Sequence, residues 1–295
     1  MTMDGTANVR ATARASHIRD HQAIAQVLRE AQPYIDALRD CFVVIKLGGS
    51  TLEEEPDALE DIIWLQSLGA RPVLVHGGGP HISAWLDRLG YTTSFVRGLR
   101  VTDAATLDVV RMVLVGKVNG ELVQAVTRRG GHAVGLSGID GPILRAERVA
   151  PELGFVGMVT EVDPRPIRAL SDAGYIPIVA PLGLGPDGQV LNINADDAAA
   201  DLARGLSAAK LLYLTDVPGI QGADGRIISA LTDAQTRALI ADGTISGGMI
   251  PKAEACLRAL ATIGRVHILD GRESHVLVRE LFTDEGAGTM IERAP

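Results

Sequence analysis

The chain has 295 residues, of which 46% are hydrophobic and 22% charged, so it can bury the core of one large α/β domain or of two lobes and is too apolar to be largely disordered. Its formal net charge of −8 argues against nucleic acid and anionic membranes as partners, so a bound phosphate would depend on local lysines and backbone amides. With only two cysteines, Cys41 and Cys256, and no signal peptide or membrane-length apolar run, we expect a cytoplasmic protein without a disulfide framework.

Residues 1–20 carry three arginines among Ala, Thr and Ser, a composition found in disordered tails and in organellar transit peptides; of the two, we expect a tail. Residues 21–40 have apolar residues at helical spacing and a proline, Pro33, placed to kink the helix. A helix with an apolar stripe ahead of a complete fold needs a partner, in its own subunit or in another. We favour another subunit and predict an oligomerisation helix.

Short apolar runs without alternation predict buried strands of a parallel sheet, at Phe42–Lys46, Pro72–Val75, His132–Leu136, Ile176–Ala180, Leu211–Leu214 and Val266–Leu269. The segments between them have apolar residues at helical spacing, at Ala58–Leu68, Ile82–Leu89, Asp103–Arg129, Asp196–Leu206, Asp233–Ala241 and Lys252–Ile263. This order predicts an α/β fold, a three-layer sandwich with a mainly parallel central sheet and helices on both faces. We place a boundary between two lobes near residue 180.

Turn signals at Gly138–Gly141 and Pro186–Gly188, with a proline-rich stretch at Asp163–Pro166 between them, predict hairpins or loops beside the carboxyl edge of the sheet. Ligands of open α/β sheets bind at this edge.

Glycine-rich turns accompany two lysines far apart in the chain. The turns are Lys46-Leu47-Gly48-Gly49, Val75-His76-Gly77-Gly78-Gly79-Pro80 and Gly247-Gly248-Met249-Ile250-Pro251-Lys252. Bare backbone in such turns can approach a phosphate, and a lysine ammonium can neutralise it. Taken alone, each lysine is equally well explained as a snorkelling side chain beside an ordinary turn. No Walker A sequence occurs, so the predicted phosphate site is of another kind.

Two further segments add polar side chains. Arg100, ahead of a long predicted helix, has the planar fork that captures a carboxylate, although a surface ion pair would explain it in isolation. Asn192, Asn194 and Asp196 precede an alanine-rich helix, where capping alone explains Asn194. Asp196 could bridge two lysine ammonium groups across a cleft. Because these elements lie at predicted strand ends, we predict that they converge on one site.

The combined set predicts phosphoryl transfer. Lysines, glycine amides and Mg²⁺ neutralise charge in its loose transition state, and an ionised carboxylate acceptor needs no general base. The histidines lack paired metal-ligand spacing, so we predict no metal site of the protein's own. His76 and His267 are interpreted as packing residues at strand ends, and both cysteines as buried structural thiols.

In this order the motifs resemble the amino acid kinase family and, within it, the acetylglutamate branch. The resemblance spans roughly residues 24 to 292 and includes Lys46-Leu47-Gly48-Gly49, Val75-His76-Gly77-Gly78-Gly79-Pro80, Gly98-Leu99-Arg100-Val101-Thr102, Leu114-Val115-Gly116-Lys117-Val118-Asn119, Asn192-Ile193-Asn194-Ala195-Asp196, Leu214-Thr215-Asp216-Val217 and Gly248-Met249-Ile250-Pro251-Lys252. Departures from the family pattern at Ser50-Thr51-Leu52, Ile139 and Met158 leave turnover and substrate tuning open.

The resemblance implies an enzyme of arginine biosynthesis that uses ATP, with Mg²⁺ carried on the nucleotide, to phosphorylate the side-chain carboxylate of N-acetyl-L-glutamate. Alternatives are a kinase for a related acid, such as an acetylated aminoadipate, and a non-catalytic arginine-sensing domain. It also implies a substrate-binding and dimerisation lobe at 41–180 and a nucleotide-binding lobe at 181–295. The implied roles are charge stabilisation by Lys46 and Lys252, orientation of both lysines by Asp196, amide donation to phosphate by Gly48, Gly49 and Gly78, substrate binding by Gly77, Gly78, Arg100 and Asn192, and nucleotide binding by Thr215, Asp216 and Lys252.

Arginine-inhibited members of this family have a kinked N-terminal helix that interlaces with that of another dimer in a hexameric ring, a trimer of dimers, and the segment ending Gln32-Pro33-Tyr34-Ile35 resembles it. The C-terminal stretch resembles their arginine-site signature. The resemblance therefore implies arginine as an effector, bound by Tyr34, Lys210, His275, Glu280, Gly286 and Gly288. The opposite interpretation is a first helix that packs on its own subunit and a last helix that is an ordinary cap. A PII-type partner protein has no support in the sequence.

Overall fold

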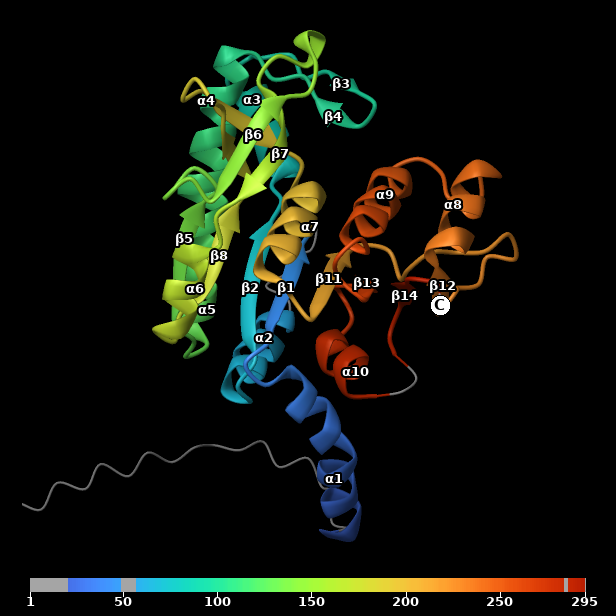
Figure 1. The fold of residues 1–295 in the computed structure, drawn as a ribbon. Helices are drawn as coiled ribbons and strands as arrows, with labels where there is room; N and C mark the ends of the chain where they lie inside the picture. Colours follow the sequence, from blue (N-terminus) through green and yellow to red (C-terminus); the bar gives the residue numbers. More distant parts are fainter. Residues whose placement is uncertain (1–20, 49–56, 284–285, 295) are drawn as a thin grey trace, which may run out of the picture.

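The computed structural model describes residues 21–48, 57–283 and 286–294, and its centre is an eight-stranded sheet (Figure 1). The strand order is β12-β14-β13-β11-β1-β2-β8-β5, and the pairings are parallel except for β13 with β14. The strands are β1 (Phe42–Leu47), β2 (Arg71–His76), β5 (Ala133–Ser137), β8 (Ile176–Ala180), β11 (Lys210–Thr215), β12 (Ala230–Thr232), β13 (Arg265–Asp270) and β14 (Thr289–Glu292). The predicted α/β class and the mainly parallel sheet are confirmed.

Each face of the sheet packs against its own group of helices, because successive side chains of a strand point to opposite faces. In β1, Val44 joins one core and Val43 and Ile45 join the other. The first core includes residues of α6 (Arg165–Asp172), α7 (Ala195–Leu206) and α9 (Met249–Ala259). The second includes residues of α2 (Ala58–Ser67), α3 (Gly79–Arg88), α4 (Ala104–Arg111), α5 (Gly120–Arg128) and α10 (Val276–Phe282). Burial on both faces explains why the central strands lack polar alternation.

Four short strands form a second, closed arrangement above the sheet: β6 (Leu144–Arg148), β7 (Val156–Val162), β9 (Leu182–Leu184) and β10 (Val190–Ile193). A two-stranded hairpin, β3 (Phe95–Val96) and β4 (Leu99–Arg100), lies nearby (Figure 1). The sequence predicted only hairpins or loops here. The alternation of buried and exposed residues in β6 was a strand signal that the search for continuous apolar runs passes over.

The long helix predicted at Asp103–Arg129 is divided by a π-helical segment, η1 (Met112–Asn119), between α4 and α5. Its last residue, Asn119, is buried against the sheet. The Asn119 amide nitrogen lies 2.9 Å from the carbonyl oxygen of Ile178, 3.2 Å from that of Leu136 and 3.1 Å from Nε2 of His76. This side chain therefore ties the helix to β8, β5 and the end of β2.

The N-terminal helix α1 (His21–Leu38) projects away from the rest of the molecule (Figure 1). It continues through Pro33, and Val27 and Leu28 on it are 61% and 62% exposed, whereas Leu38 at its end is buried. The predicted tail, residues 1–20, lies outside the described residues. Strands from both sides of residue 180 belong to one sheet, and the division into lobes there stays a prediction.

None of the helices in the described ranges is long and apolar enough to cross a membrane.

Replacing Asn119 by Ala should lower the free energy of unfolding by about 1–3 kcal/mol, because buried carbonyl groups lose their donor. Urea unfolding of the two proteins measures this difference. The matched control is Gln124→Ala on the exposed side of α5, expected to stay within about 0.5 kcal/mol of the parent. Equal stabilities of Asn119→Ala and the parent would contradict the role given to this amide.

Candidate active site

One carboxylate joins two lysines at the carboxyl edge of the sheet. Asp196 lies in the first turn of α7, with Oδ1 2.8 Å from Nζ of Lys46 and Oδ2 3.0 Å from Nζ of Lys252. All three side chains are largely buried, with 14%, 9% and 9% of their surfaces exposed. The structure thus brings together three residues that are 56 to 206 positions apart in the sequence.

Local structure places each of the three. Lys46 is the penultimate residue of β1, and Lys252 lies in the first turn of α9. Asn194 is the N-cap of α7, accepting hydrogen bonds from the amides of Asp196, at 2.8 Å, and Asp197, at 3.2 Å, as its sequence position predicted.

A tyrosine that the sequence analysis did not single out completes the cluster. The hydroxyl of Tyr213 donates to the backbone oxygen of Asp196 at 3.0 Å, and Nζ of Lys252 lies 5.5 Å from the centre of its ring. Tyr213 is fully buried in β11. The signal available in the sequence was its place in the predicted strand Leu211–Leu214, one residue before the end. The structure adds that Tyr213 is paired with Lys46 in the adjacent strand.

Charge and burial oppose each other in this cluster. Burial alone would raise the pKa of Asp196, but the charges of Lys46 and Lys252 outweigh burial and lower this pKa to about 2. Burial is the main reason why the pKa of Lys46 is lowered, with Asp196 acting in the opposite direction. A carboxylate that stays ionised is what keeps two ammonium groups side by side.

The structure describes two of the three glycines predicted to donate to a phosphate. The amide of Gly48 donates to the carbonyl of Leu214 at 2.9 Å, continuing the pairing of β1 with β11, and its bond to a phosphate stays a prediction. Gly49 lies outside the described residues. Gly78 precedes α3, and a Cβ there would come within 2.6 Å of Cδ2 of Leu114, so a larger residue at this position would require the leucine side chain of η1 to shift.

Arg100 and Asn192 line a cavity of about 180 Å³, here called the Arg100 cavity, together with Gly77 and Gly78. The guanidinium of Arg100 donates to the backbone oxygen of Gly79 at 3.1 Å and to Ser83 Oγ at 2.9 Å. Its central carbon lies 4.7 Å from the ring centre of Phe95. These contacts hold a buried cation in the cavity wall. All four residues predicted to bind substrate therefore lie around one space.

Asn192 faces the same cavity from the second set of strands. Its side-chain nitrogen donates to Thr102 Oγ1 at 3.2 Å, and Thr102 in turn donates to the carbonyl of Arg100 at 2.8 Å. A buried threonine thus connects the two predicted substrate-binding residues.

A second space of about 190 Å³, the Gly219 cavity, lies past the end of β11. Thr215 ends this strand, and its hydroxyl donates to Asp216 at 3.2 Å. The cavity begins two residues after Thr215 and is lined by Val217, Pro218, Gly219, Ile220, Gln221, Thr244, Ile245, Ser246 and Met249. Met249 opens α9, the helix that carries Lys252. The segment 244–246 was not predicted to take part, although Ser246 stands next to a predicted glycine turn.

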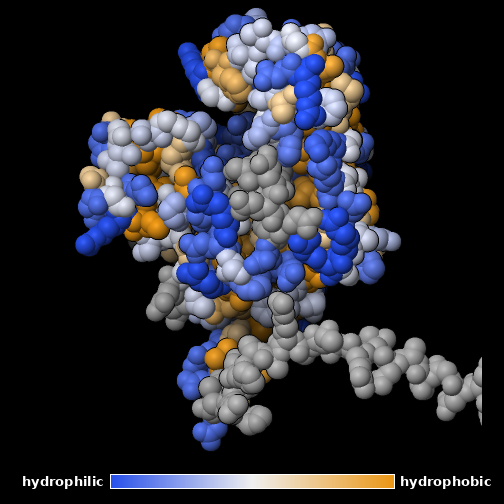
Figure 2. All heavy atoms as spheres, turned by 180° about the vertical axis from the view of Figure 1, so that it is seen from behind, coloured by the Kyte–Doolittle hydropathy of each residue, from blue (hydrophilic) through white to orange (hydrophobic). Residues whose placement is uncertain are grey.

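Figure 2 shows the molecule from behind, with a hollow between its upper part and the C-terminal part.

Among the residues that the structure describes, no three His, Cys, Asp or Glu side chains gather in a way that would hold a metal ion.

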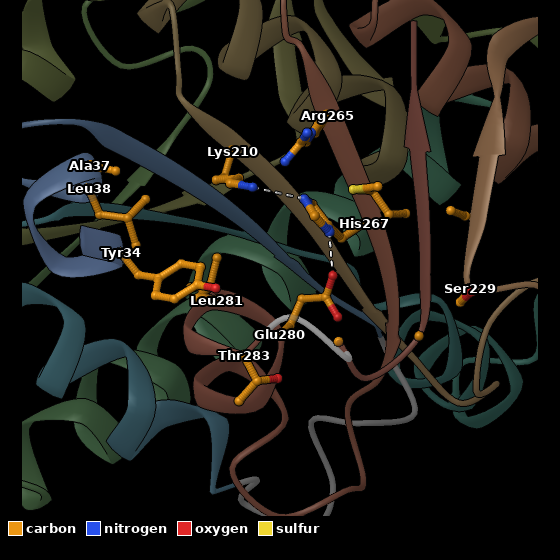
Figure 3. A pocket seen from close by; sticks show the side chains of 14 residues that line it. Tyr34, Ala37, Leu38, Lys210, Ser229, Arg265, His267, Glu280, Leu281 and Thr283 are labelled. Atoms are coloured by element: carbon orange, nitrogen blue, oxygen red, sulfur yellow. Dashed lines mark hydrogen bonds and ion pairs between the residues drawn. The ribbon is translucent and has the colours of Figure 1, made fainter. Parts of the chain in front are cut away.

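A third and larger space of about 400 Å³, the Glu280 cavity, lies where α1, α10 and the amino ends of β11 and β13 meet (Figure 3). Five of the six residues predicted to bind an effector line it, namely Tyr34, Lys210, Glu280, Gly286 and Gly288. His275 does not line it and instead contacts Asp61 on α2, with Nδ1 2.8 Å from Oδ1. The cavity contains His267 in its place.

His267 is therefore not the strand-end packing residue that the sequence suggested. It is the third residue of β13, with Nδ1 2.5 Å from Glu280 Oε1 and Nε2 3.4 Å from Nζ of Lys210 (Figure 3). Glu280 also accepts a hydrogen bond from the amide of Ala287 at 2.6 Å. Burial would raise the pKa of Glu280, but His267, the Ala287 amide and Lys210 together lower it, so the cavity contains a carboxylate.

Comparisons with known proteins agree with this geometry. Residues 42–270 match the family model described as "Amino acid kinase family". The chain is 47% identical over 277 residues to the acetylglutamate kinase of Jannaschia sp. (strain CCS1), covering 92% of this chain and 97% of that one. It is 48% identical over 275 residues to the acetylglutamate kinase of Acaryochloris marina (strain MBIC 11017), covering 90% and 96%.

Solved structures share the fold of this chain. The N-acetylglutamate synthase from Neisseria gonorrhoeae, complexed with coenzyme A and N-acetyl-glutamate, superimposes with a TM-score of 0.81 at 30% identity, covering 92% of this chain and 64% of the synthase. Carbamate kinase from Giardia lamblia bound to AMP-PNP superimposes with a TM-score of 0.64 at 17% identity, covering 86% and 99%, which is a likeness of fold.

The contact between His275 and Asp61 gives a pH-dependent prediction. Its hydrogen bond to Asp61, followed by the charges of Asp61, Asp57 and Glu60, raises its pKa. A raised histidine pKa contributes stability that is present below the unfolded value of about 6.5 and is lost as the pH rises through the folded value. His275→Gln should therefore destabilise the protein at pH 6, by less than about 1 kcal/mol because the His275 side chain is 57% exposed, and have no effect at pH 9. Urea unfolding at both pH values tests this, and an effect confined to pH 9 would contradict it.

Proposed function

Because this chain belongs to the amino acid kinase family and is similar over nine-tenths of its length to acetylglutamate kinases, we propose that it transfers the γ-phosphoryl group of ATP to the side-chain carboxylate of N-acetyl-L-glutamate. The products are the acyl phosphate and ADP. The observation that carries the proposal is the pair of lysines held by Asp196 near the Arg100 cavity, on one side, and the Gly219 cavity, on the other.

The lysine pair suits the chemistry of this reaction. The transferring phosphoryl group carries its charge on nonbridging oxygens, and fixed cations that meet this charge lower the barrier without reorganising. Asp196 holds both cations before substrate arrives. The acceptor carboxylate is already ionised near neutral pH, so the residues around it have only to align it with the phosphorus atom.

The Arg100 cavity suits a small dicarboxylic acid. Arg100 presents a guanidinium that can grip an α-carboxylate, and Asn192 has an amide that can add a hydrogen bond. Gly77 and Gly78, which also line the cavity, let the substrate backbone approach closely. A longer acid, such as an acetylated aminoadipate, is the nearest alternative substrate. A non-catalytic sensing domain is less well supported, because binding alone does not require two lysines held by one buried carboxylate.

We assign the nucleotide to the Gly219 cavity and the residues before it, Thr215 and Asp216, with its phosphates directed toward Lys252. The proposed division of labour has 41–180 bind the acid and 181–295 bind the nucleotide. Both carboxylate oxygens of Asp196 are engaged by lysines, so this residue does not fit a metal ligand. Mg²⁺ would be carried on the ATP phosphates and add to the neutralisation of their charge.

We further propose that the Glu280 cavity binds arginine as an inhibitor. A buried carboxylate at its wall can pair with a guanidinium, while Lys210 is placed to meet a carboxylate. Tyr34, Ala37 and Leu38 form one wall from α1, so the site depends on a helix whose outer half is exposed. An apolar side of α1 available to another subunit supports a hexameric ring of dimers.

A coupled assay that compares N-acetylglutamate, glutamate, aspartate and N-acetylaminoadipate as acceptors tests the proposed reaction. N-acetylglutamate should have a kcat/KM at least about tenfold above that of the others, since Arg100 and the cavity size select a short acylated acid. ADP release with none of these acids, or preference for the longer one, would refute the assignment.

Lys46→Ala and Lys252→Ala should each lower kcat by a factor on the order of 10² or more, because each removes a positioned charge aimed at the transition state. Arg100→Ala should mainly raise the KM for N-acetylglutamate. Steady-state kinetics separate the two effects. Lys117→Ala is the matched control, since this partly exposed lysine pairs with Glu121 one turn away on the same helical stretch. Near-normal turnover in both lysine variants would exclude the proposed catalytic site.

Removing residues 1–39 should give an active dimer whose arginine inhibition is at least about tenfold weaker, because α1 supplies a wall of the Glu280 cavity and the proposed ring contact. Sedimentation and an arginine titration of the full and truncated chains measure both effects. A full-length dimer, or a hexamer indifferent to millimolar arginine, speaks against the proposal.

A further inference from the structure

One buried threonine connects the wall of the Glu280 cavity with the wall of the Gly219 cavity. Thr289 is the first residue of β14 and is fully buried. Its two neighbours, Gly288 and Met290, line the Glu280 cavity, whereas Thr289 pairs with Ile268 of β13, which belongs to the core on the opposite face of the sheet. Because adjacent residues of a strand face opposite ways, Thr289 points away from the Glu280 cavity.

On that opposite side, Thr289 holds the loop that lines the Gly219 cavity. Its Oγ1 accepts a hydrogen bond from the amide of Ile220 at 2.8 Å, and this contact is buried. Gly219 has φ of +144°, and a Cβ on it would lie 2.6 Å from the same oxygen. The loop approaches so closely because this position is a glycine. Both Gly219 and Ile220 line the cavity.

The returning half of the same loop is fixed to the same short strand. Ile228 donates its amide to the carbonyl of Ile220 at 2.9 Å, and Met290 donates its amide to the carbonyl of Ser229 at 2.9 Å. Ser229 itself lines the Glu280 cavity (Figure 3). A shift of residues 286–290 would therefore move both ends of the loop.

We propose that Thr289 is a positioning residue for nucleotide binding, through which a ligand in the Glu280 cavity alters the affinity for ATP. The second half rests on the proposed binding of arginine in that cavity. The physical basis is the buried hydrogen bond from the Ile220 amide to the Thr289 hydroxyl. If Thr289 moves or loses its oxygen, this N–H is left buried without an acceptor, which costs free energy, or the loop that carries Ile220 shifts. Coupling of this kind is reciprocal, so ATP must alter arginine affinity by the same factor.

The first experiment compares Thr289→Val, which keeps the shape and removes the acceptor, with Thr289→Ser, which keeps the acceptor. In the full-length enzyme, Thr289→Val should raise the KM for ATP about tenfold while kcat and the KM for N-acetylglutamate change less than about twofold. Thr289→Ser should bring the KM for ATP back to within about threefold of the parent. An unchanged KM for ATP in the valine variant, or equal values for valine and serine, would overturn the positioning role.

The second experiment measures arginine binding by calorimetry with and without the non-hydrolysable ATP analogue AMP-PNP. In the parent the dissociation constant for arginine should differ between the two conditions, and in Thr289→Val arginine should still bind but with the same constant in both. Coupling that survives in Thr289→Val refutes the proposed link. Failure of the parent to bind arginine refutes the effector site, while the KM test of Thr289 still stands or falls separately.

Gly219→Ala provides a variant that leaves β14 untouched, in case Thr289→Val does not fold. The added methyl group pushes the loop away from Thr289, so the KM for ATP should rise with kcat little changed. The KM for ATP of the double variant should be no higher than that of the more affected single variant, because both substitutions remove the same contact. Additive effects of the two changes, or no effect of Gly219→Ala, would count against the contact.

Discussion

Asp196 forms ion pairs with both Lys46 and Lys252, and these two contacts constrain how the surrounding elements meet. Two buried ammonium groups repel each other, and only an ionised carboxylate between them makes their proximity stable. This requirement fixes where three elements must meet: the end of β1 and the first turns of α7 and α9. The cap at Asn194 and the hydroxyl of Tyr213 hold the backbone that carries the carboxylate. The same cluster also lies beside the spaces in which donor and acceptor would be placed.

The alternation of side chains along shared strands separates the two functional regions. In β11, Tyr213 belongs to the core beside α7 and α9, whereas Leu212 and Leu214 belong to the core beside α10. Lys210 is two residues before Leu212, so its side chain points to the same face of the sheet as that of Leu212. Lys210 is the first residue of β11 and Thr215 is the last. The Glu280 cavity and the lysine cluster are thus at opposite ends of one strand and on opposite faces of the sheet. A rigid sheet between them can transmit a shift without either ligand touching the other.

The closed arrangement of four short strands, β6, β7, β9 and β10, provides part of the wall of the Arg100 cavity. It supplies Asn192 from β10 and Val156 from β7 to the wall of the Arg100 cavity, opposite the glycine turn that precedes α3. Thr102 joins this wall to Arg100 through two hydrogen bonds. The Arg100 cavity therefore takes part of its lining from the closed set of short strands, whereas the Gly219 cavity is lined by loop residues and by Met249 of α9.

The fold class, the six central strands and the residues of the lysine cluster could be predicted from the sequence, because burial on both faces, helical periodicity and glycine turns are all local patterns. The histidine of the Glu280 cavity could not be predicted in this way. His267 and His275 are both close in sequence to residues that line the cavity, but in the assembled structure His267 lines it and His275 contacts Asp61 on α2. The same holds for the Gly48 amide, whose acceptor, Leu214, is 166 positions away. Contacts between strands distant in the chain leave no periodic signal in either segment, so these assignments required the assembled sheet.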